Sequence, residues 1–446
     1  MEKDKFNKKL RECARTLSPK QNERDLIANI YQSLNDLFGV ANCIQIGSYP
    51  RFTAITPVHD LDILYFLGDW NEISHDPATA LQYLNSKLLT EYNNPTNYKI
   101  EVSLQTHSVT LVFKDNGEEI FSVDIVPAYI FSKNEFDEDT YKVPEVIRKR
   151  HGKDRTEYYL KLFQEHKEMG WINSDPRGYI KIASEIDKST GGEFRNTVKI
   201  IKSWRNNLVD EDHNLELKSF HLEQIITILF QRNQYLDIFD AIFKFFIELP
   251  HIVNNPYQIS DRADDVKFID DYLEEFTNEQ KERIKSARDG FLIKLENIKE
   301  SDYVGELLEI DFYVRKPSEE FLFDSQIKTF IDNNLRFKID GFVKPLAGFS
   351  SGWLTQTSQL QKGLTRGQGK TREIEFSIRN NTTSASEYRW KVKNDDRCEE
   401  PRGEITLNQT RNNPEKTAYV GEHYVECYAV SDNVCIAKSR VSVKII

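Results

Sequence analysis

Three aspartates on two predicted strands constrain this chain more than any other feature of its sequence. Asp60 and Asp62 stand at the start of a predicted strand that runs to residue 67, and Asp124 lies inside the apolar run 123–126. Because side chains alternate between the two faces of a strand, Asp60 and Asp62 are predicted to point the same way. If the two strands pair side by side, the three carboxylates converge.

Converging carboxylates need a counter-charge, and a divalent cation is the natural one. Oxygen ligands of this kind suit Mg²⁺ or Mn²⁺ bound together with substrate phosphates. Three carboxylates can hold two such ions about 4 Å apart, which activates an attacking hydroxyl and stabilises a leaving pyrophosphate. An Asp-x-Asp pair alone also occurs as exposed acids at a strand end, and Asp124 argues against that alternative.

Gly47 and Ser48 follow a short apolar strand predicted over residues 43–46. A glycine lets the backbone approach a ligand closely, and a serine offers a hydroxyl and a backbone N–H to a phosphate oxygen. His59, beside Asp60, is a candidate general base. Carboxylates usually serve in metal-dependent phosphoryl transfer, so a structural or outer role is favoured for this histidine.

Apolar periodicity predicts a mixed α and β architecture. The first forty residues have helical spacing, and the runs 109–113 and 120–126 alternate around a hairpin turn signal at 115–117. Helical patterns dominate residues 155–335. Short alternating strands separated by turn residues follow beyond residue 372, which is typical of a small β-sandwich.

The pattern predicts four segments. They are a catalytic core with an N-terminal helix (1–155), a helical nucleotide-binding domain (156–338), a linker or basic loop (339–372) and a C-terminal β-sandwich (373–446). The third segment is rich in Gly, Ser, Thr and Gln and contains no acidic residue from 341 onward, which favours a linker.

Charge and cysteine content exclude some classes of protein. With 71 acidic and 60 basic residues, the net charge of -11 excludes a protein that coats nucleic acid through bulk charge. No apolar run approaches the ~20 residues of a membrane-spanning helix, and the charged first ten residues predict no signal peptide. Five cysteines without a Cys-x-x-Cys pair predict free thiols in a reducing, cytoplasmic compartment rather than a zinc site.

The aspartate-bearing segment resembles the nucleotidyltransferase signature of the polymerase-β-like superfamily. More closely, it resembles the bacterial relatives of cyclic GMP–AMP synthase and oligoadenylate synthase, the SMODS or CD-NTase group. The pattern of that group is Gly-Ser, a Thr-Ala-Ile stretch, Asp-x-Asp and a lone Asp in an apolar strand, and residues 53–55 and 123–127 match it. Phe52 stands where the group usually has Gly. The resemblance implies an α+β fold, with a polymerase-β-like nucleotidyltransferase core and a helical domain.

The same resemblance implies that Lys202 and Ser219 hold the triphosphate. The family carries a lysine on one helix and a serine before the next, and these two residues match those positions. A lysine offsets a triphosphate as a point charge. From the residues alone, a surface lysine and a helix N-cap serine are the alternatives.

The last hundred residues resemble the C-terminal sensor domain fused to some SMODS enzymes. The matching segments are 389–394, 402–405, 419–423 and 426–428. The resemblance implies an immunoglobulin-like, all-β domain that senses a nucleotide or another ligand. Residues 341–446 hold 16 basic and 12 acidic side chains, so Arg389, Lys391 and Lys393 are candidate contacts for an anionic ligand.

The resemblance implies an enzyme that joins nucleoside triphosphates into a cyclic or short linear oligonucleotide signal, with pyrophosphate release, in bacterial antiphage defence. Asp60 and Asp62 would bind two Mg²⁺ or Mn²⁺ ions, and Asp124 would complete the second site and help to deprotonate the acceptor hydroxyl. A separately encoded effector is also implied. No membrane association is expected, and the oligomeric state stays open.

Three alternatives remain open at this point. The first is the same chemistry on deoxynucleotides, which would give short single-stranded DNA, with Tyr419, Tyr424 and Tyr428 as candidate protein primers. The second is nucleotidyl transfer to RNA or to a protein, of which transfer to tRNA is disfavoured by the net acidity. The third is a catalytically silent nucleotide sensor, against which the intact aspartate triad argues.

Overall fold

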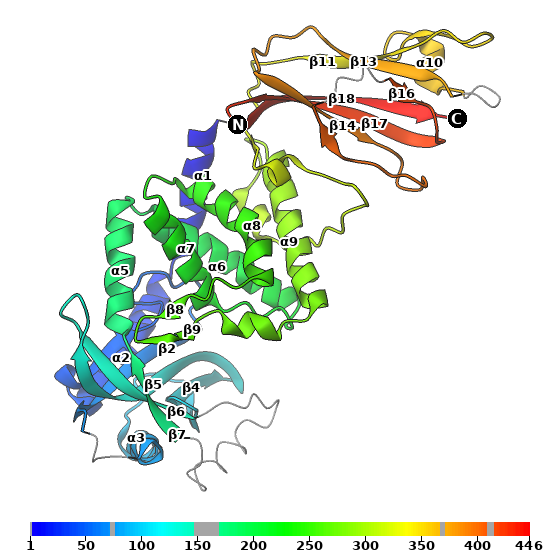
Figure 1. The fold of residues 1–446 in the computed structure, drawn as a ribbon. Helices are drawn as coiled ribbons and strands as arrows, with labels where there is room; N and C mark the ends of the chain where they lie inside the picture. The colour runs from blue at the N-terminus through cyan, green and yellow to red at the C-terminus, as the bar shows by residue number, and fades with distance from the viewer. Residues whose placement is uncertain (1, 72–75, 147–168, 366–370, 408–413) are drawn as a thin grey trace.

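A computed structural model describes residues 2–71, 76–146, 169–365, 371–407 and 414–446. Figure 1 shows a sheet-containing region built from the N-terminal part of the chain, a helical region in the middle and a β-rich region at the C-terminal end. The mixed α+β class predicted from the sequence is confirmed. None of the described helices is long and apolar enough to span a membrane.

The helices and strands have the following bounds. The helices are α1 (Lys3–Thr16), α2 (Gln21–Phe38), α3 (Pro77–Glu91), α5 (Pro176–Ser189), α6 (Glu193–Glu211), α7 (Ser219–Arg232), α8 (Ile238–Asn254), α9 (Asn278–Asn297) and α10 (Ser358–Lys362). The strands of the N-terminal and middle regions are β1 (Cys43–Ile46), β2 (Asp60–Asp69), β3 (Lys99–Leu104), β4 (Val109–Asp115), β5 (Glu118–Lys133), β6 (Asp139–Val146), β7 (Met169–Ser174), β8 (Ser260–Asp261) and β9 (Asp264–Phe268). Those of the C-terminal region are β10 (Lys328–Thr329), β11 (Lys338–Val343), β12 (Gly352–Trp353), β13 (Glu373–Arg379), β14 (Glu387–Lys393), β15 (Ile405–Thr406), β16 (Glu415–Lys416), β17 (Gly421–Ser431) and β18 (Val434–Ile445).

The N-terminal sheet has an apolar cluster on each face, and the aspartates lie on the face opposite to helices α2 and α3. Its strands run in the order β1-β2-β5-β4-β3, with β6 paired to β5 and β7 paired to β6. Helices α2 and α3 cover one face, where Ile30 and Leu84 pack in the same core as Leu61 and Ile63 of β2. Strand alternation therefore turns the neighbouring aspartates of β2 to the other face.

The predicted hairpin between β4 and β5 is confirmed. Asn116 and Gly117 both have positive φ angles, 51° and 92°. Two positive φ angles in a two-residue loop match the twist of the flanking strands. The hairpin sets the register of β5, which also pairs in parallel with β2 and places Asp62 opposite Asp124.

Helix α1 packs with the helical region, although the sequence places it beside the catalytic core. Its residues Phe6, Leu10 and Ala14 recur at helical spacing, and all three join the core formed by α6, α7, α8 and α9. Residues 156–168 of the predicted helical domain lie outside the described residues. The described remainder of the domain is mainly helical, but it also contains β7, which joins the N-terminal sheet, the short β8–β9 hairpin, and β10, which pairs with β18.

The described residues of the predicted linker (339–365 and 371–372) contribute to the C-terminal β-rich region, because they include most of β11 and all of β12. Strand β11 pairs with both β12 and β13 in a four-stranded sheet, and a second sheet has the order β10-β18-β17-β14-β15. Apolar side chains of both sheets, such as Ile339, Phe376 and Val425, meet in one core. The composition indicated a loop, but inward-facing Ile339 and Val343 give β11 the alternation of a strand.

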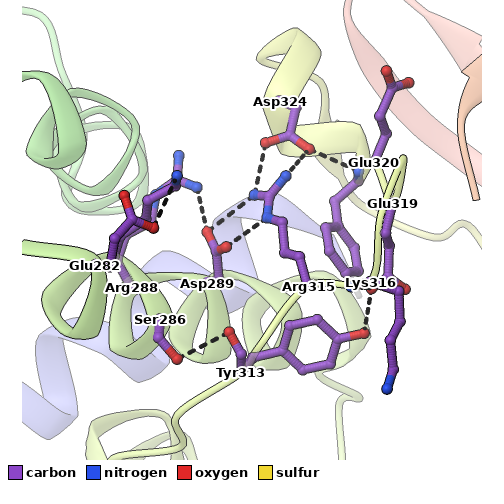
Figure 2. Close-up of polar contacts among 12 residues, drawn as sticks. Glu282, Ser286, Arg288, Asp289, Tyr313, Arg315, Lys316, Glu319, Glu320 and Asp324 are labelled. Atoms are coloured by element: carbon purple, nitrogen blue, oxygen red, sulfur yellow. Dashed lines mark hydrogen bonds and ion pairs between the residues drawn. The ribbon is translucent and has the colours of Figure 1, made fainter. Parts of the chain in front are cut away.

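A partly buried ion network joins α9 to the segment that leads into the C-terminal region (Figure 2). The Arg315 guanidinium donates to both carboxylate oxygens of Asp289 on α9, with Nε 2.6 Å from Oδ2. It also donates to both oxygens of Asp324, at 2.7 and 2.9 Å. Arg288 adds a bond of 2.6 Å to Asp289. One guanidinium thus bridges two segments that are distinct in sequence.

Candidate functional site

A cavity of about 610 Å³ collects most of the predicted site residues. Six of the seven line it, namely Gly47, Ser48, Asp60, Asp62, Lys202 and Ser219. Further lining residues come from the loop after β1, the start of α5, helices α6 and α7, and β8, and they include Arg51, Thr53, His59, Asp175, Tyr179, Arg205, Asn206, Phe220 and Asp261. The cavity therefore lies between the sheet and the helical region.

Asp124 lies beside Asp62 rather than in the cavity lining. The two residues are paired in the register of β2 and β5. The Asp124 carboxylate accepts hydrogen bonds from the hydroxyls of Thr110 and Ser108, the second at 3.3 Å. These hydroxyl donors of β4 and its preceding turn fix the orientation of the carboxylate.

The aspartates influence one another electrostatically. Burial raises the pKa of Asp62 to about 7, and the charges of Asp60 and Asp124 add to this shift. Arg51 and Lys202 oppose it without cancelling it. A carboxylate in this position is stabilised by any additional cation, so the donor chemistry fits a divalent metal ion.

The described residues contain no group of three His, Cys, Asp or Glu side chains already placed to hold a metal ion. The three aspartates nevertheless share one edge of two paired strands, and their oxygens are the ligand type that Mg²⁺ and Mn²⁺ prefer. Such ions usually complete their coordination with substrate phosphates and water rather than with a full protein cage.

Gly47 is required by the position of the Asp62 carboxylate. Its φ angle is 75°, in the region that favours glycine. A Cβ atom at this position would lie 1.8 Å from Oδ2 of Asp62. The turn after β1 therefore carries glycine because the backbone passes directly against a candidate metal ligand.

Lys202 is not a surface lysine, because a buried carboxylate holds it at the cavity wall. Its Nζ atom donates to Oε2 of Glu223 at 2.7 Å and to the Thr53 hydroxyl at 3.3 Å. Glu223 also accepts from Nε of Arg51 at 2.6 Å and from the Thr53 hydroxyl at 2.9 Å. Sequence analysis missed Glu223 and Arg51. A single acidic residue inside the apolar stripe of α7 is the signal that points to a buried partner.

The loop between β1 and β2 (residues 47–59) is held in place by several elements. Nε of Arg195 on α6 donates to the Arg51 carbonyl at 2.9 Å. The Val58 amide donates to Glu23 of α2 at 2.8 Å. Phe52 has a φ angle of 61°, the left-handed conformation that a glycine adopts freely. The loop is therefore preorganised around the cavity.

Ser219 and His59 both line the cavity. Lys218, not Ser219, is the N-cap residue of α7, and Ser219 is the first helical residue facing the cavity. The N-cap alternative for Ser219 is therefore wrong. His59 lines the cavity, and its carbonyl accepts from the Ser122 amide at 2.8 Å, which ties the start of β2 to β5.

The basic residues of the C-terminal region are largely occupied within the chain. Lys391 is buried and donates to the Glu320 carbonyl at 2.7 Å. Lys393 is also buried and donates to Asp396 at 2.5 Å. The Arg389 guanidinium pairs with Glu387. These three side chains are thus structural in the described arrangement rather than open to an anionic ligand.

The Asp62 pKa gives a testable pH dependence. Without metal, the folded protein binds a proton at Asp62 up to about pH 7, whereas the unfolded chain releases it near pH 4. The stabilisation by this proton is present at low pH and is lost as the pH rises through 7. In EDTA, Asp62→Asn should therefore remove part of the fall in unfolding free energy between about pH 4 and pH 7, as measured by urea denaturation. An identical fall in both proteins would contradict the shift.

Comparison with known proteins finds several solved structures similar to this chain. CdnC of Escherichia coli MS115-1 with ATP is 16% identical, with 69% of this chain and 99% of that chain covered and a TM-score of 0.47. DncV of Escherichia coli in its 3'-deoxy GTP bound form is 17% identical, with coverage of 66% and 76% and a TM-score of 0.43. Vibrio cholerae DncV cyclic AMP-GMP synthase is 14% identical, with coverage of 61% and 68% and a TM-score of 0.42. No curated protein matches the chain.

Among family models, the Adenylyl/Guanylyl and SMODS C-terminal sensor domain matches residues 316–446. The predicted resemblance to the SMODS group is thereby confirmed in the part of the chain that carries this domain. The match begins well before residue 373, in agreement with strands β10 to β12 belonging to the C-terminal region.

Proposed function

We propose that this protein, in which residues 316–446 match the sensor domain, is a metal-dependent nucleotidyltransferase. It would polymerise nucleoside triphosphates into a cyclic or short linear oligonucleotide signal in bacterial antiphage defence and release pyrophosphate. One observation carries the proposal, since a single cavity brings together two candidate metal-binding aspartates and the candidate triphosphate-binding residues. Carboxylates for cations beside groups for phosphates are the parts that phosphoryl transfer requires.

Asp60, Asp62 and Asp124 would hold two Mg²⁺ or Mn²⁺ ions. When bound, these ions would lower the pKa of an acceptor hydroxyl and neutralise charge on the leaving pyrophosphate. The chain itself orients the aspartate carboxylates. The hydroxyls of Ser108 and Thr110 hold Asp124, and the turn at Gly47 lets the backbone pass against Asp62.

The phosphate groups would lie between the loop after β1 and the starts of the helices. The Ser48 amide and hydroxyl and the Ser219 hydroxyl are neutral donors for phosphate oxygens. Lys202 and Arg51 supply positive charge at the same wall. Together these groups would align the triphosphate so that the acceptor hydroxyl attacks opposite the leaving pyrophosphate.

The C-terminal region is proposed to be an immunoglobulin-like sandwich that binds a regulatory ligand. Two sheets that share one core support the sandwich. The matched family is described as a sensor domain, which supports the regulatory role. The effector of the product would be encoded separately.

Mass spectrometry of reaction products tests the proposal most directly. The protein is incubated with each NTP or dNTP and with Mg²⁺ or Mn²⁺, and both free products and intact protein are analysed. Cyclic or linear oligoribonucleotides with pyrophosphate release would support it. DNA oligomers, or nucleotides attached to a tyrosine, would favour the deoxynucleotide alternative instead. Absence of any product would leave the silent sensor as the better account.

A further inference from the structure

Glu223 does not line the cavity but contacts Arg51, Thr53 and Lys202, which do, and it is more deeply buried than either cation. Only 1% of its side chain is exposed. It lies in the first turns of α7, yet its carboxylate contacts side chains from two other elements. These are Arg51 and Thr53 of the loop after β1 and Lys202 of α6. The carboxylate therefore ties the loop after β1 to helices α6 and α7 behind residues that line the cavity.

Glu223 does not neutralise both of its cationic partners, Arg51 and Lys202, and both of these line the cavity. One buried carboxylate faces two buried cations, so the cluster keeps one positive charge. Burial alone would raise the pKa of Glu223, but Arg51 and Lys202 lower it to about 2, so it stays ionised. The same two cations act on Asp62, which shows that their field reaches the aspartates.

Glu223 favours the protonated, positively charged form of Lys202. Burial lowers the pKa of Lys202, and the charge of Glu223 opposes that effect. The other charged groups that act on Lys202 are Arg51, which also lowers its pKa, and Asp60, which raises it. A buried lysine that loses its carboxylate partner tends to lose its proton, and a neutral amine is a poor phosphate ligand.

We propose that Glu223 is a positioning residue of the triphosphate site, which holds Lys202 and Arg51 at the cavity wall in their charged forms. It would not touch the nucleotide and would act through these two side chains. The proposal rests on the proposed function, because it assigns the anion recognised by the two cations as a nucleoside triphosphate.

Glu223→Gln is the principal test, with KM and kcat for Mg²⁺·ATP and Mg²⁺·dATP measured separately. Loss of an outer partner of this kind typically costs about 10–100-fold in ligand affinity or activity. The phosphates are bound in both the ground state and the transition state, so KM should rise by this factor and kcat should change less. In the variant KM should also rise further with increasing pH, because Lys202 without its carboxylate partner loses its proton more readily. Glu223→Asp, which keeps the charge, should recover part of the affinity.

A double-mutant cycle separates an action through Lys202 from a general loss of stability. Adding Glu223→Gln to Lys202→Met should raise KM by less than it does in the wild-type protein, because the two residues act as one unit. Asp289→Asn is the matched control, because it also removes a carboxylate buried between two arginines, but away from the cavity. It should lower the melting temperature and leave KM unchanged.

Two results would overturn the proposal. One is a folded Glu223→Gln protein with wild-type KM across the pH range. The other is an equal rise in KM for Asp289→Asn at an equal loss of melting temperature. Direct titration of Mg²⁺·ATP by calorimetry keeps this test separate from the proposed function. If the wild-type protein binds ATP but forms no product, the polymerase proposal fails while the role of Glu223 is still decided.

Discussion

Replacing Asp60 and Asp62 together by Asn is expected to reduce pyrophosphate release by at least about 10³-fold. Removal of one preorganised electrostatic group commonly costs about 10²–10³-fold, and this variant removes two adjacent carboxylates. Both line the cavity, and their oxygens are the candidate metal ligands. The measurement is pyrophosphate release from each NTP in the presence of Mg²⁺ or Mn²⁺.

The stability of this double variant distinguishes loss of chemistry from loss of fold. Asp62 is half-buried near two other aspartates, and its raised pKa indicates that its charge is unfavourable in the metal-free protein. The double variant should therefore melt at the same temperature as the wild type or higher in EDTA. Asp69→Asn, at the other end of β2 and outside the cavity lining, is the matched control and should remain active. An active double variant would rule out the proposed mechanism.

Gly47→Ala is expected to lower activity by about 10²-fold, the typical result of displacing a reacting group by ~1 Å. The new Cβ atom would lie 1.8 Å from Oδ2 of Asp62, so this carboxylate must rotate away from its position. The φ angle of 75° adds backbone strain of about 1–2 kcal/mol for any residue other than glycine. Activity and the free energy of unfolding are measured on the same preparation.

Gly117→Ala separates the effect of backbone strain from the effect of a Cβ atom that displaces the Asp62 carboxylate. Gly117 also has a positive φ angle, 92°, but a Cβ atom there would have no neighbour within 4 Å. This control should lose a comparable amount of stability through backbone strain and keep its activity. If both variants lose activity equally, the close approach of Gly47 to Asp62 is not what matters for the chemistry.

Local patterns were sufficient to predict the sheet edge that carries the aspartates. Alternation placed Asp60 and Asp62 on one face, and the Asn116-Gly117 turn fixed the hairpin that brings Asp124 beside them. These features depend on residues that are close in sequence or on the period of a strand. The family resemblance then added Lys202 and Ser219, and both line the same cavity.

Features that depend on distant partners could not be predicted in this way. Glu223 meets Arg51, which is 172 positions away, and no local pattern encodes that contact. Lys391 and Lys393 looked available for a ligand because sequence gives charge but not burial, and their partners come from irregular segments. In residues 339–372, composition favoured a loop, whereas pairing of β11 with the distant strand β13 made it part of a sheet.

The bridging guanidinium of Arg315 has a consequence for cooperativity. Asp289 belongs to a helix that packs in the helical core, and Asp324 lies within the segment matched by the sensor-domain family. Local opening of either segment would leave a buried charge without its partner, so the two segments are expected to open together. Amide hydrogen exchange in α9 would then slow when a ligand binds the C-terminal region, which makes this helix a reporter of sensor occupancy.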